Sequence, residues 1–282
     1  MTLYAMKITL NIILLFTLFQ STAQNLVPNP SFEFFISPPD FLSELDKATP
    51  WFSPNYASPD LFCTCSTNLG TAPSNVFGTE LPHSGQSYAG LSTFEIQDWR
   101  EYISVQLLDT LEFGIKYWAS FYVSLADNSK YSMNKIGAFF SGNQFQQTTT
   151  STIIASPQIL NDSTNSLSNK NGWTLIKSSF IASGGEKYIN IGNFFSQSQT
   201  DTIFVGAAVI PDTIAYFYID DICVSTDSLT CAGNVGLEEL SSQNKKLVQI
   251  VDIMGRETDD KPNTLLIYVY SDGTKEKVFR IE

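Results

Sequence analysis

Histidine is nearly absent from this sequence, and this shortage excludes several kinds of catalytic site. His83 is the only histidine among 282 residues, which excludes zinc sites built from several histidines and makes any Ser-His-Asp arrangement depend on one residue. It lies in the turn-like sequence His83-Ser84-Gly85, where a turn position is the better interpretation. The chain also lacks a GxSxG elbow, a phosphate-binding glycine loop and an HExxH motif. We therefore expect a protein that is not an enzyme.

Positive charge is also scarce. Lys and Arg number 16 against 28 Asp and Glu, so the formal net charge is −12. No cluster of Lys and Arg is interleaved with aromatic residues, and a phosphate backbone would be repelled by such a surface. We therefore expect no nucleic-acid partner.

Long apolar runs are missing except near the N-terminus. There Lys7 precedes an apolar run that ends at Phe19, and Ser21-Thr22-Ala23 suits signal-peptidase cleavage before Gln24. The run is shorter than the ~20 residues that a membrane-spanning helix needs. We predict a signal peptide at residues 1–23, no membrane span after its removal, and a secreted or outer-surface location.

Aromatic residues are abundant and lie in alternating patterns. The chain has 21 Phe, 12 Tyr and 4 Trp, which fit half-buried strands better than helices. In 102–107, 117–125 and 188–191 the odd-numbered and even-numbered residues form two alternating sets, such as Ile103 and Val105 against Ser104 and Gln106. Each segment therefore has an inward and an outward face. This pattern predicts an all-β protein with two packed sheets.

The alternation stops in two places, which suggest where the chain divides. Residues 144–172 are rich in Thr, Ser and Asn and predict a long surface excursion. A second break follows residue 225. We predict one domain at 24–225, a linker at 226–236 and a separate unit at 237–282.

The tail of the chain has a pattern of its own. Alternating residues 265–270, turn residues 271–274 and a second alternating run predict a β-hairpin. Together DIMGRE at 252–257, PNTLLIYVY at 262–270 and the basic last strand resemble a type A sorting domain of type IX secretion in the Bacteroidota. The resemblance implies that residues 237–282 form a small β-sandwich that engages the secretion machinery. An ordinary small β-domain is the alternative.

The body of the chain carries three further motifs. NLVPNPSFE at 25–33, HSGQSYAGL at 83–91 and YFYIDDICV at 216–224 follow one another in this order. In that order they resemble the galactose-binding-like jelly rolls, which include many carbohydrate-binding modules. The resemblance implies a jelly-roll β-sandwich from Asn25 to about Val224, and it specifies the fold better than any ligand.

That resemblance also implies a structural calcium ion. In such jelly rolls the opening and closing strands commonly each bring a carboxylate to one Ca²⁺, which takes six to eight oxygen ligands. The matching residues are Glu33 and either Asp220 or Asp221, with backbone oxygens of 84–86 as further ligands. A bulge would exchange the two aspartates. The alternative is that all three are ordinary carboxylates at strand ends.

Aromatic residues in polar and proline-rich sequence offer a ligand platform. The rings of Trp51, Tyr56 and Trp99, together with Phe52 and Tyr102, would stack on sugar rings. Asp60, Asn75, Asp98 or Arg100 would bind the hydroxyl groups. Core packing is the alternative for Trp51 and Trp99, and it is the preferred interpretation for Trp118 and Trp173.

Four cysteines suit an exported protein, and disulfides are the default interpretation. A bridge between Cys223 and Cys231 needs only a short turn. Pairing of Cys63 with Cys65 is less comfortable, and long-range pairing between the two clusters stays open.

These expectations combine into an exported binding module, stabilised by calcium, whose partner is a glycan or another cell-surface polymer. A structural or adhesion protein with a protein partner is the first alternative. An unrecognised hydrolase is the weaker one, because Glu80, Glu95, Asp98 and Glu101 lie in no recognised motif.

Overall fold

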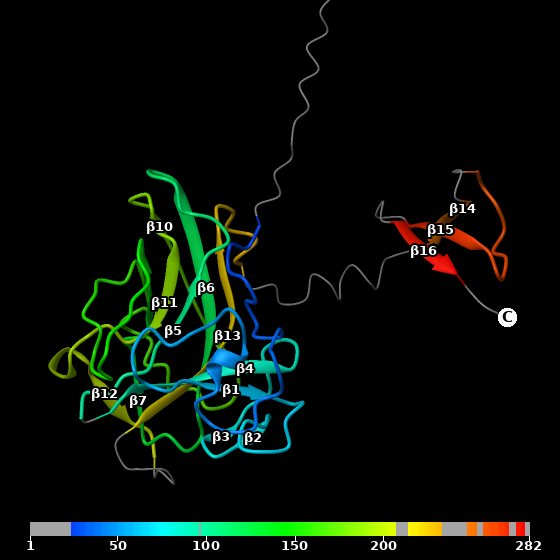
Figure 1. Cartoon of the computed structure of the whole chain (residues 1–282). Coiled ribbons are helices and arrows are strands. Elements are labelled where there is room, and N and C mark those ends of the chain that lie inside the picture. Colours follow the sequence, from blue (N-terminus) through cyan, green and yellow to red (C-terminus); the bar gives the residue numbers. More distant parts are fainter. Residues whose placement is uncertain are drawn as a thin grey trace, which may run out of the picture. The chain divides into compact units, whose positions relative to one another are not determined.

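The computed structural model describes residues 24–95, 97–206, 214–232, 247–252, 256–270 and 275–279 (Figure 1). The chain divides into two compact units, Met1–Ala232 and Gly233–Glu282. The predicted signal peptide lies outside the described residues, and so does the linker after Ala232. Among the parts of the chain that are described, no helix has the length and apolar character needed to cross a membrane.

The first unit contains a five-stranded antiparallel sheet. Its strand order is β1-β4-β13-β6-β10. The strands are β1 (Asp60–Cys63), β4 (Ser87–Phe94), β13 (Ala215–Ser225), β6 (Lys116–Leu125) and β10 (Thr174–Ile181).

A four-stranded antiparallel sheet packs against it and completes a jelly-roll β-sandwich. Its order is β5-β11-β8-β9, with β5 (Ile103–Gln106), β11 (Tyr188–Gly192), β8 (Gly137–Ser141) and β9 (Ile159–Leu160). One buried cluster takes alternate side chains from both sheets, which confirms the predicted alternation. From β6, β5 and β11 it includes Tyr117, Ala119, Phe121, Val123, Leu125, Ile103, Val105, Ile189 and Ile191.

Loops cover the outer faces of the sheets. Short ladders join β2 (Ser74–Asn75) to β3 (Gly78–Thr79) and β7 (Tyr131–Met133) to β12 (Thr202–Phe204). The helical turns of the described chain are η1 (Leu45–Lys47) and η2 (Gln197–Gln199). The outer face of the five-stranded sheet is aromatic, with Phe62, Tyr88, Tyr216 and Tyr218 in a second buried cluster.

Gly90 makes room for one of these rings. A Cβ atom at this position would lie 2.1 Å from the Tyr216 hydroxyl oxygen and 2.7 Å from the Phe62 ring. Glycine on β4 therefore leaves room for the Tyr216 hydroxyl, which donates a hydrogen bond to Asp60. This contact positions part of a cavity described below.

Both disulfides are local. Cys223 pairs with Cys231 as predicted, and Cys63 pairs with Cys65, the pairing that the sequence disfavours. The Cα atoms of Cys63 and Cys65 are 5.0 Å apart, within the usual range for a bridge. The Cys223–Cys231 bond ties residues 226–231 to the last strand, so the first unit continues beyond residue 225 to Ala232.

The second unit contains a three-stranded antiparallel sheet of β14 (Leu247–Val251), β15 (Leu265–Tyr270) and β16 (Lys275–Phe279). β15 pairs with β16 from Leu265 opposite Phe279 to Val269 opposite Lys275. This pairing confirms the predicted hairpin, whose turn at 271–274 lies outside the described residues.

Candidate functional site

The outer face of the four-stranded sheet carries the loop that follows β8. Ile153 N donates to the Tyr102 hydroxyl at 2.9 Å, and the Phe145 ring lies 5.7 Å from the Phe139 ring between centroids. At the end of the loop, the Gln158 side chain accepts from Phe140 N and donates to Phe140 O. The predicted surface excursion is therefore fixed to the sheet by hydrogen bonds and ring contacts.

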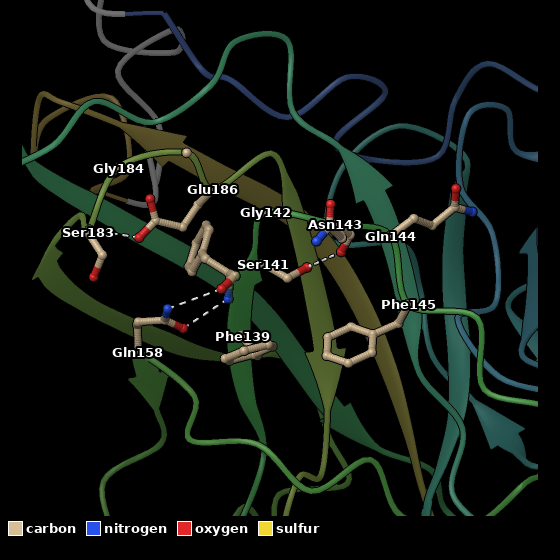
Figure 2. A pocket seen from close by; sticks show the side chains of 12 residues that line it. Phe139, Ser141, Gly142, Asn143, Gln144, Phe145, Gln158, Ser183, Gly184 and Glu186 are labelled. Atoms are coloured by element: carbon tan, nitrogen blue, oxygen red, sulfur yellow. Dashed lines mark hydrogen bonds between the residues drawn. The ribbon is translucent and has the colours of Figure 1, made fainter.

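A hollow of about 510 Å³ opens between this loop and the turn that precedes β11. Figure 2 shows the rings of Phe139 and Phe145 next to each other beneath the 142–144 segment. The size is within the range of small-molecule and sugar sites. The hollow is lined by Phe139, Phe140, Ser141, Gly142, Asn143, Gln144, Phe145, Gln158, Ser183, Gly184, Gly185 and Glu186.

Polar groups around these rings are free to bind. The side-chain amides of Asn143 and Gln144 are exposed, and no hydrogen bond joins either amide to another described residue. Glu186 is 7% exposed and accepts from Ser183 N at 2.7 Å through one oxygen. Its other oxygen, Oε2, is buried and has no partner among the described residues. A buried carboxylate oxygen without a donor is uncommon, and here it lies beside a hollow that a ligand hydroxyl would enter.

A second hollow of about 360 Å³ adjoins the first, because Gln144 lines both. Its other lining side chains combine amides with aromatic rings. Tyr56, predicted as a ligand residue, is 73% exposed here. The hollow is lined by Phe52, Ser53, Pro54, Asn55, Tyr56, Gln144, Gln146, Gln147 and Thr148.

Trp51 does not present its ring to a ligand, and that prediction is wrong. Its side chain is 2% exposed, its indole nitrogen donates to Asn29 O at 2.8 Å, and its ring lies 5.0 Å from the Phe32 ring. Trp51 is therefore part of the core. The proline-rich sequence around it shapes a loop that folds inward.

Arg100 is also buried and does not bind a ligand hydroxyl. It is 0% exposed, and its guanidinium donates to Glu95 O, Trp99 O and Gln197 Oε1 while it lies 4.8 Å from the centre of the Phe94 ring. Asp60 is buried as well, so neither residue lies on an open platform as predicted. Asp60 and the half-buried Trp99 instead line a separate small cavity.

The residues that the resemblance ties to calcium meet at the 83–87 segment. Glu33 Oε1 accepts from Gln86 N and Ser87 N at 2.8 and 2.9 Å. Gly85 has φ +61°, and a Cβ there would lie 2.3 Å from Glu33 Oε1, so this close approach requires glycine. The opening motif is therefore joined directly to the turn that precedes β4.

The closing motif reaches the same turn. Asp220 accepts from His83 N at 2.9 Å and from Asp221 N at 2.7 Å. Burial raises the pKa of Asp220 well above its usual range, and the charge of Asp221 adds to the rise. A register shift follows Asp220 on β13, and Asp221 accepts hydrogen bonds from Ser31 and Ser84.

This arrangement fits hydrogen bonding better than cation coordination. Backbone N–H groups already point at Glu33 and Asp220, whereas Ca²⁺ needs several oxygen lone pairs directed at one point. Calcium binding at Glu33, Asp220 and Asp221 therefore stays a prediction from the resemblance, and no part of the proposed function depends on it.

His83 does not form a catalytic relay with its neighbour. Its Nδ1 lies 2.5 Å from Asp221 Oδ2, and Ser84 donates to Asp221 Oδ1. The serine hydroxyl therefore faces the carboxylate rather than the imidazole, which is not the order of a Ser-His-Asp triad. The His83 ring stacks on Tyr122 at 3.6 Å between centroids, in keeping with a structural turn.

Sequence reasoning missed most of the residues that line the large hollow. Phe139 lies within a strand, where its sequence does not distinguish it from a packing residue. Phe145, Gln158 and Glu186 lie in segments without hydrophobic periodicity. The one available signal was the run of amide and hydroxyl residues directly after the strand, at 143–151.

Comparisons with known proteins give only distant likenesses. No family model and no curated protein matches the chain. The CBM22-1 xylan-binding domain of Paenibacillus barcinonensis Xyn10C is 13% identical, covers 72% of this chain and 94% of its own, and has a TM-score of 0.37. The K3 cleaved adhesin domain of Lys-gingipain from Porphyromonas gingivalis W83 is 12% identical, covers 72% and 98%, and has a TM-score of 0.39. At such values neither likeness carries an argument about what this chain binds.

Proposed function

We propose that this chain is an exported, non-catalytic protein that binds a polysaccharide across the two hollows joined at Gln144. The observation that carries the proposal is the combination of free amides and an unpartnered buried carboxylate oxygen around paired aromatic rings. Sugar rings offer apolar faces for aromatic side chains and hydroxyl groups for amides and carboxylates. The acidic net charge favours a neutral polymer over an anionic one.

Affinity electrophoresis of the full chain in gels with soluble xylan, β-glucan, mannan or galactan tests this proposal. At least one polysaccharide should retard the chain. Gln144→Ala removes an exposed amide that lines both hollows, and Phe145→Ala removes one of the paired rings. Each should weaken retardation about tenfold, because losing a central contact costs roughly 1.4 kcal/mol.

Phe34→Ala is the matched control, because Phe34 is exposed and lines neither hollow. It should migrate like the unmodified chain in every gel. A chain that no polysaccharide retards, or a retardation that Gln144→Ala and Phe145→Ala leave unchanged, would refute the proposal.

One observation favours the alternative of a protein partner. Phe34, Ile36 and Phe41 are exposed within one N-terminal loop, and exposed apolar groups of this kind often mark protein contacts. The alternative predicts no retardation by any polysaccharide and a loss of partner capture when Ile36 and Phe41 are replaced by serine.

We further propose that residues 237–282 direct the protein through type IX secretion to the cell surface or the medium. The resemblance of DIMGRE and PNTLLIYVY supports this, together with the three-stranded sheet of the second unit. The first unit has its own buried core, so the tail is not needed for its folding.

Truncation after Gly236 tests the route. In a Bacteroidota host with this secretion system, the truncated protein should fold and stay inside the outer membrane. Fractionation and immunoblotting would measure its surface and medium levels. Levels equal to those of the full-length protein would contradict a sorting role for the tail.

A further inference from the structure

A third cavity, of about 170 Å³, lies at the outer face of the five-stranded sheet. It shares no lining residue with the two hollows described above. Four of its lining residues are polar and almost fully buried, namely Asp60, Ser92, Glu101 and Tyr216. The more exposed lining residues are Leu42, Ser43, Ser58, Phe77, Glu95, Trp99 and Ile214.

The cavity is acidic and has no internal counter-charge. Asp60, Glu95 and Glu101 line it, and no Lys, Arg or His does so among the described residues. Arg100, the neighbour of Glu101 in sequence, directs its guanidinium to other groups. The carboxyl groups of Asp60 and Glu101 are therefore buried together without a cation.

This burial changes the protonation of the pair. It raises the pKa of Glu101 to about 8, and the charge of Asp60 adds to the rise, while hydrogen bonds from Ser92 N and Ser58 N oppose it. Burial likewise raises the pKa of Asp60 to about 6. At neutral pH the pair therefore holds a proton where a cation is missing.

Ser92 gives an independent indication that a ligand belongs here. The residue is 6% exposed, and its hydroxyl oxygen is buried without a hydrogen-bond partner in the described part of the chain. Native proteins rarely leave such a group unsatisfied unless a ligand or an ordered water meets it. Ser92 lies on β4 beside Tyr216 of β13, on the same outer face as Asp60.

The aromatic walls favour a cation over a neutral polar ligand. Trp99, Phe77 and Tyr216 line the cavity, and the last two rings stack at 3.7 Å between centroids. Ammonium groups bind well to the faces of such rings when carboxylates are also present.

We propose that this cavity binds an organic ammonium group, which donates hydrogen bonds to Asp60, Glu101 and Ser92 beside the ring of Trp99. Two kinds of ligand carry such an ammonium group, an amino sugar and the side chain of lysine. Binding ionises the carboxyl pair and releases the shared proton. This inference does not depend on the polysaccharide site.

The size of the cavity favours binding rather than glycoside hydrolysis. A cavity of about 150 Å³ holds a single six-membered ring. A volume of about 170 Å³ therefore takes an alkylammonium group or one amino sugar. It does not take the two sugar rings that flank a scissile bond between paired carboxylates.

Titration calorimetry of the full chain with n-butylammonium and with 1-butanol tests the proposal. The two probes have similar size and differ in charge. At pH 8 in 0.15 M NaCl, which screens general attraction to the acidic surface, the amine should bind and the alcohol should not.

The affinity for n-butylammonium should also rise more than tenfold between pH 6 and pH 8. The ionised fraction of Glu101 rises over this range because its pKa is about 8, whereas an alkylamine stays charged up to about pH 10. The other titratable groups that line the cavity are Asp60, Glu95 and Tyr216. Burial raises the pKa of Tyr216 well above its usual value, so it stays neutral.

Glu101→Gln should abolish amine binding. Glu80→Gln is the matched control, because Glu80 is also a buried carboxyl, bonded to Ser124, but does not line the cavity. It should bind like the unmodified chain. Equal binding of amine and alcohol, no binding at pH 8, or amine binding that Glu101→Gln retains would each overturn the proposal. If Glu101→Gln does not fold, the pH profile of the unmodified chain decides.

Glucosamine and Nα-acetyl-lysine methylamide distinguish the two sources. Tighter binding of glucosamine, with glucose as its neutral control, identifies an amino sugar. Tighter binding of the lysine derivative identifies a protein side chain. Failure of both, when n-butylammonium also fails, overturns the proposal and leaves the polysaccharide site unaffected.

Discussion

Replacing Glu101 with glutamine should stabilise the first unit at pH 8 by on the order of 4 kcal/mol, since one unit of pKa is about 1.4 kcal/mol. The folded protein keeps the Glu101 proton up to about pH 8, whereas a free glutamate releases it near 4.5. The stability that this proton provides is complete below pH 4.5 and is lost as the pH rises to 8. A glutamine side chain at this position carries no charge at any pH, so the variant does not lose that stability.

Thermal unfolding between pH 4.5 and 8 would measure this effect. The Tm of Glu101→Gln should match that of the unmodified chain near pH 4.5 and exceed it by roughly 10 °C at pH 8. The glutamine oxygen still accepts from Ser92 N, and its amide can donate to the Ser58 hydroxyl, while Ser58 N loses a long hydrogen bond of 3.3 Å. Parallel pH profiles of the two proteins would show that Glu101 is not a strained buried acid.

Replacing Trp51 with alanine should destabilise the fold by about 3–5 kcal/mol, the usual cost of removing a buried tryptophan. Trp51 packs on Phe32 and donates a hydrogen bond to Asn29 O, so the substitution leaves a void and leaves Asn29 O with the hydrogen bond from Phe32 N alone. The Tm should fall by roughly 10 °C, and polysaccharide binding by the folded protein should not change.

Tyr56→Ala is the contrasting variant, because Tyr56 is exposed and lines the smaller hollow. Its Tm should stay close to that of the unmodified chain, since surface substitutions usually change stability by less than about 0.5 kcal/mol. Its polysaccharide binding should weaken. If Trp51→Ala left the Tm unchanged and removed binding, Trp51 would be a ligand residue after all.

The strands could be predicted from sequence because their pattern is local. In Lys116–Leu125 every second side chain from Tyr117 onward enters the core, and this period of two is visible without the fold. The hairpin of β15 and β16 is also local, because only residues 271–274 separate its two strands. Alternation reports burial directly, so it predicts strands and hairpins well.

The candidate sites could be predicted only in small part, because they depend on contacts distant in sequence. Tyr56 was identified from the sequence, but the smaller hollow that it lines also needs Gln144, which comes from another loop. Trp51 and Arg100 lie in polar sequence and yet are buried. Asp60 begins β1, and Glu101 lies in the segment before β5. The two come together because Glu101 accepts hydrogen bonds from Ser92 N on β4 and from Ser58 N just before β1.

Hydrogen–deuterium exchange of the full chain, with and without the polysaccharide that retards it most, tests the central claim most directly. Binding across the joined hollows should slow exchange in residues 52–56, 139–148, 158 and 183–186, which line them. Exchange elsewhere in the first unit should change little. Protection confined to another surface, or no protection at saturating polysaccharide, would contradict the assignment of this site.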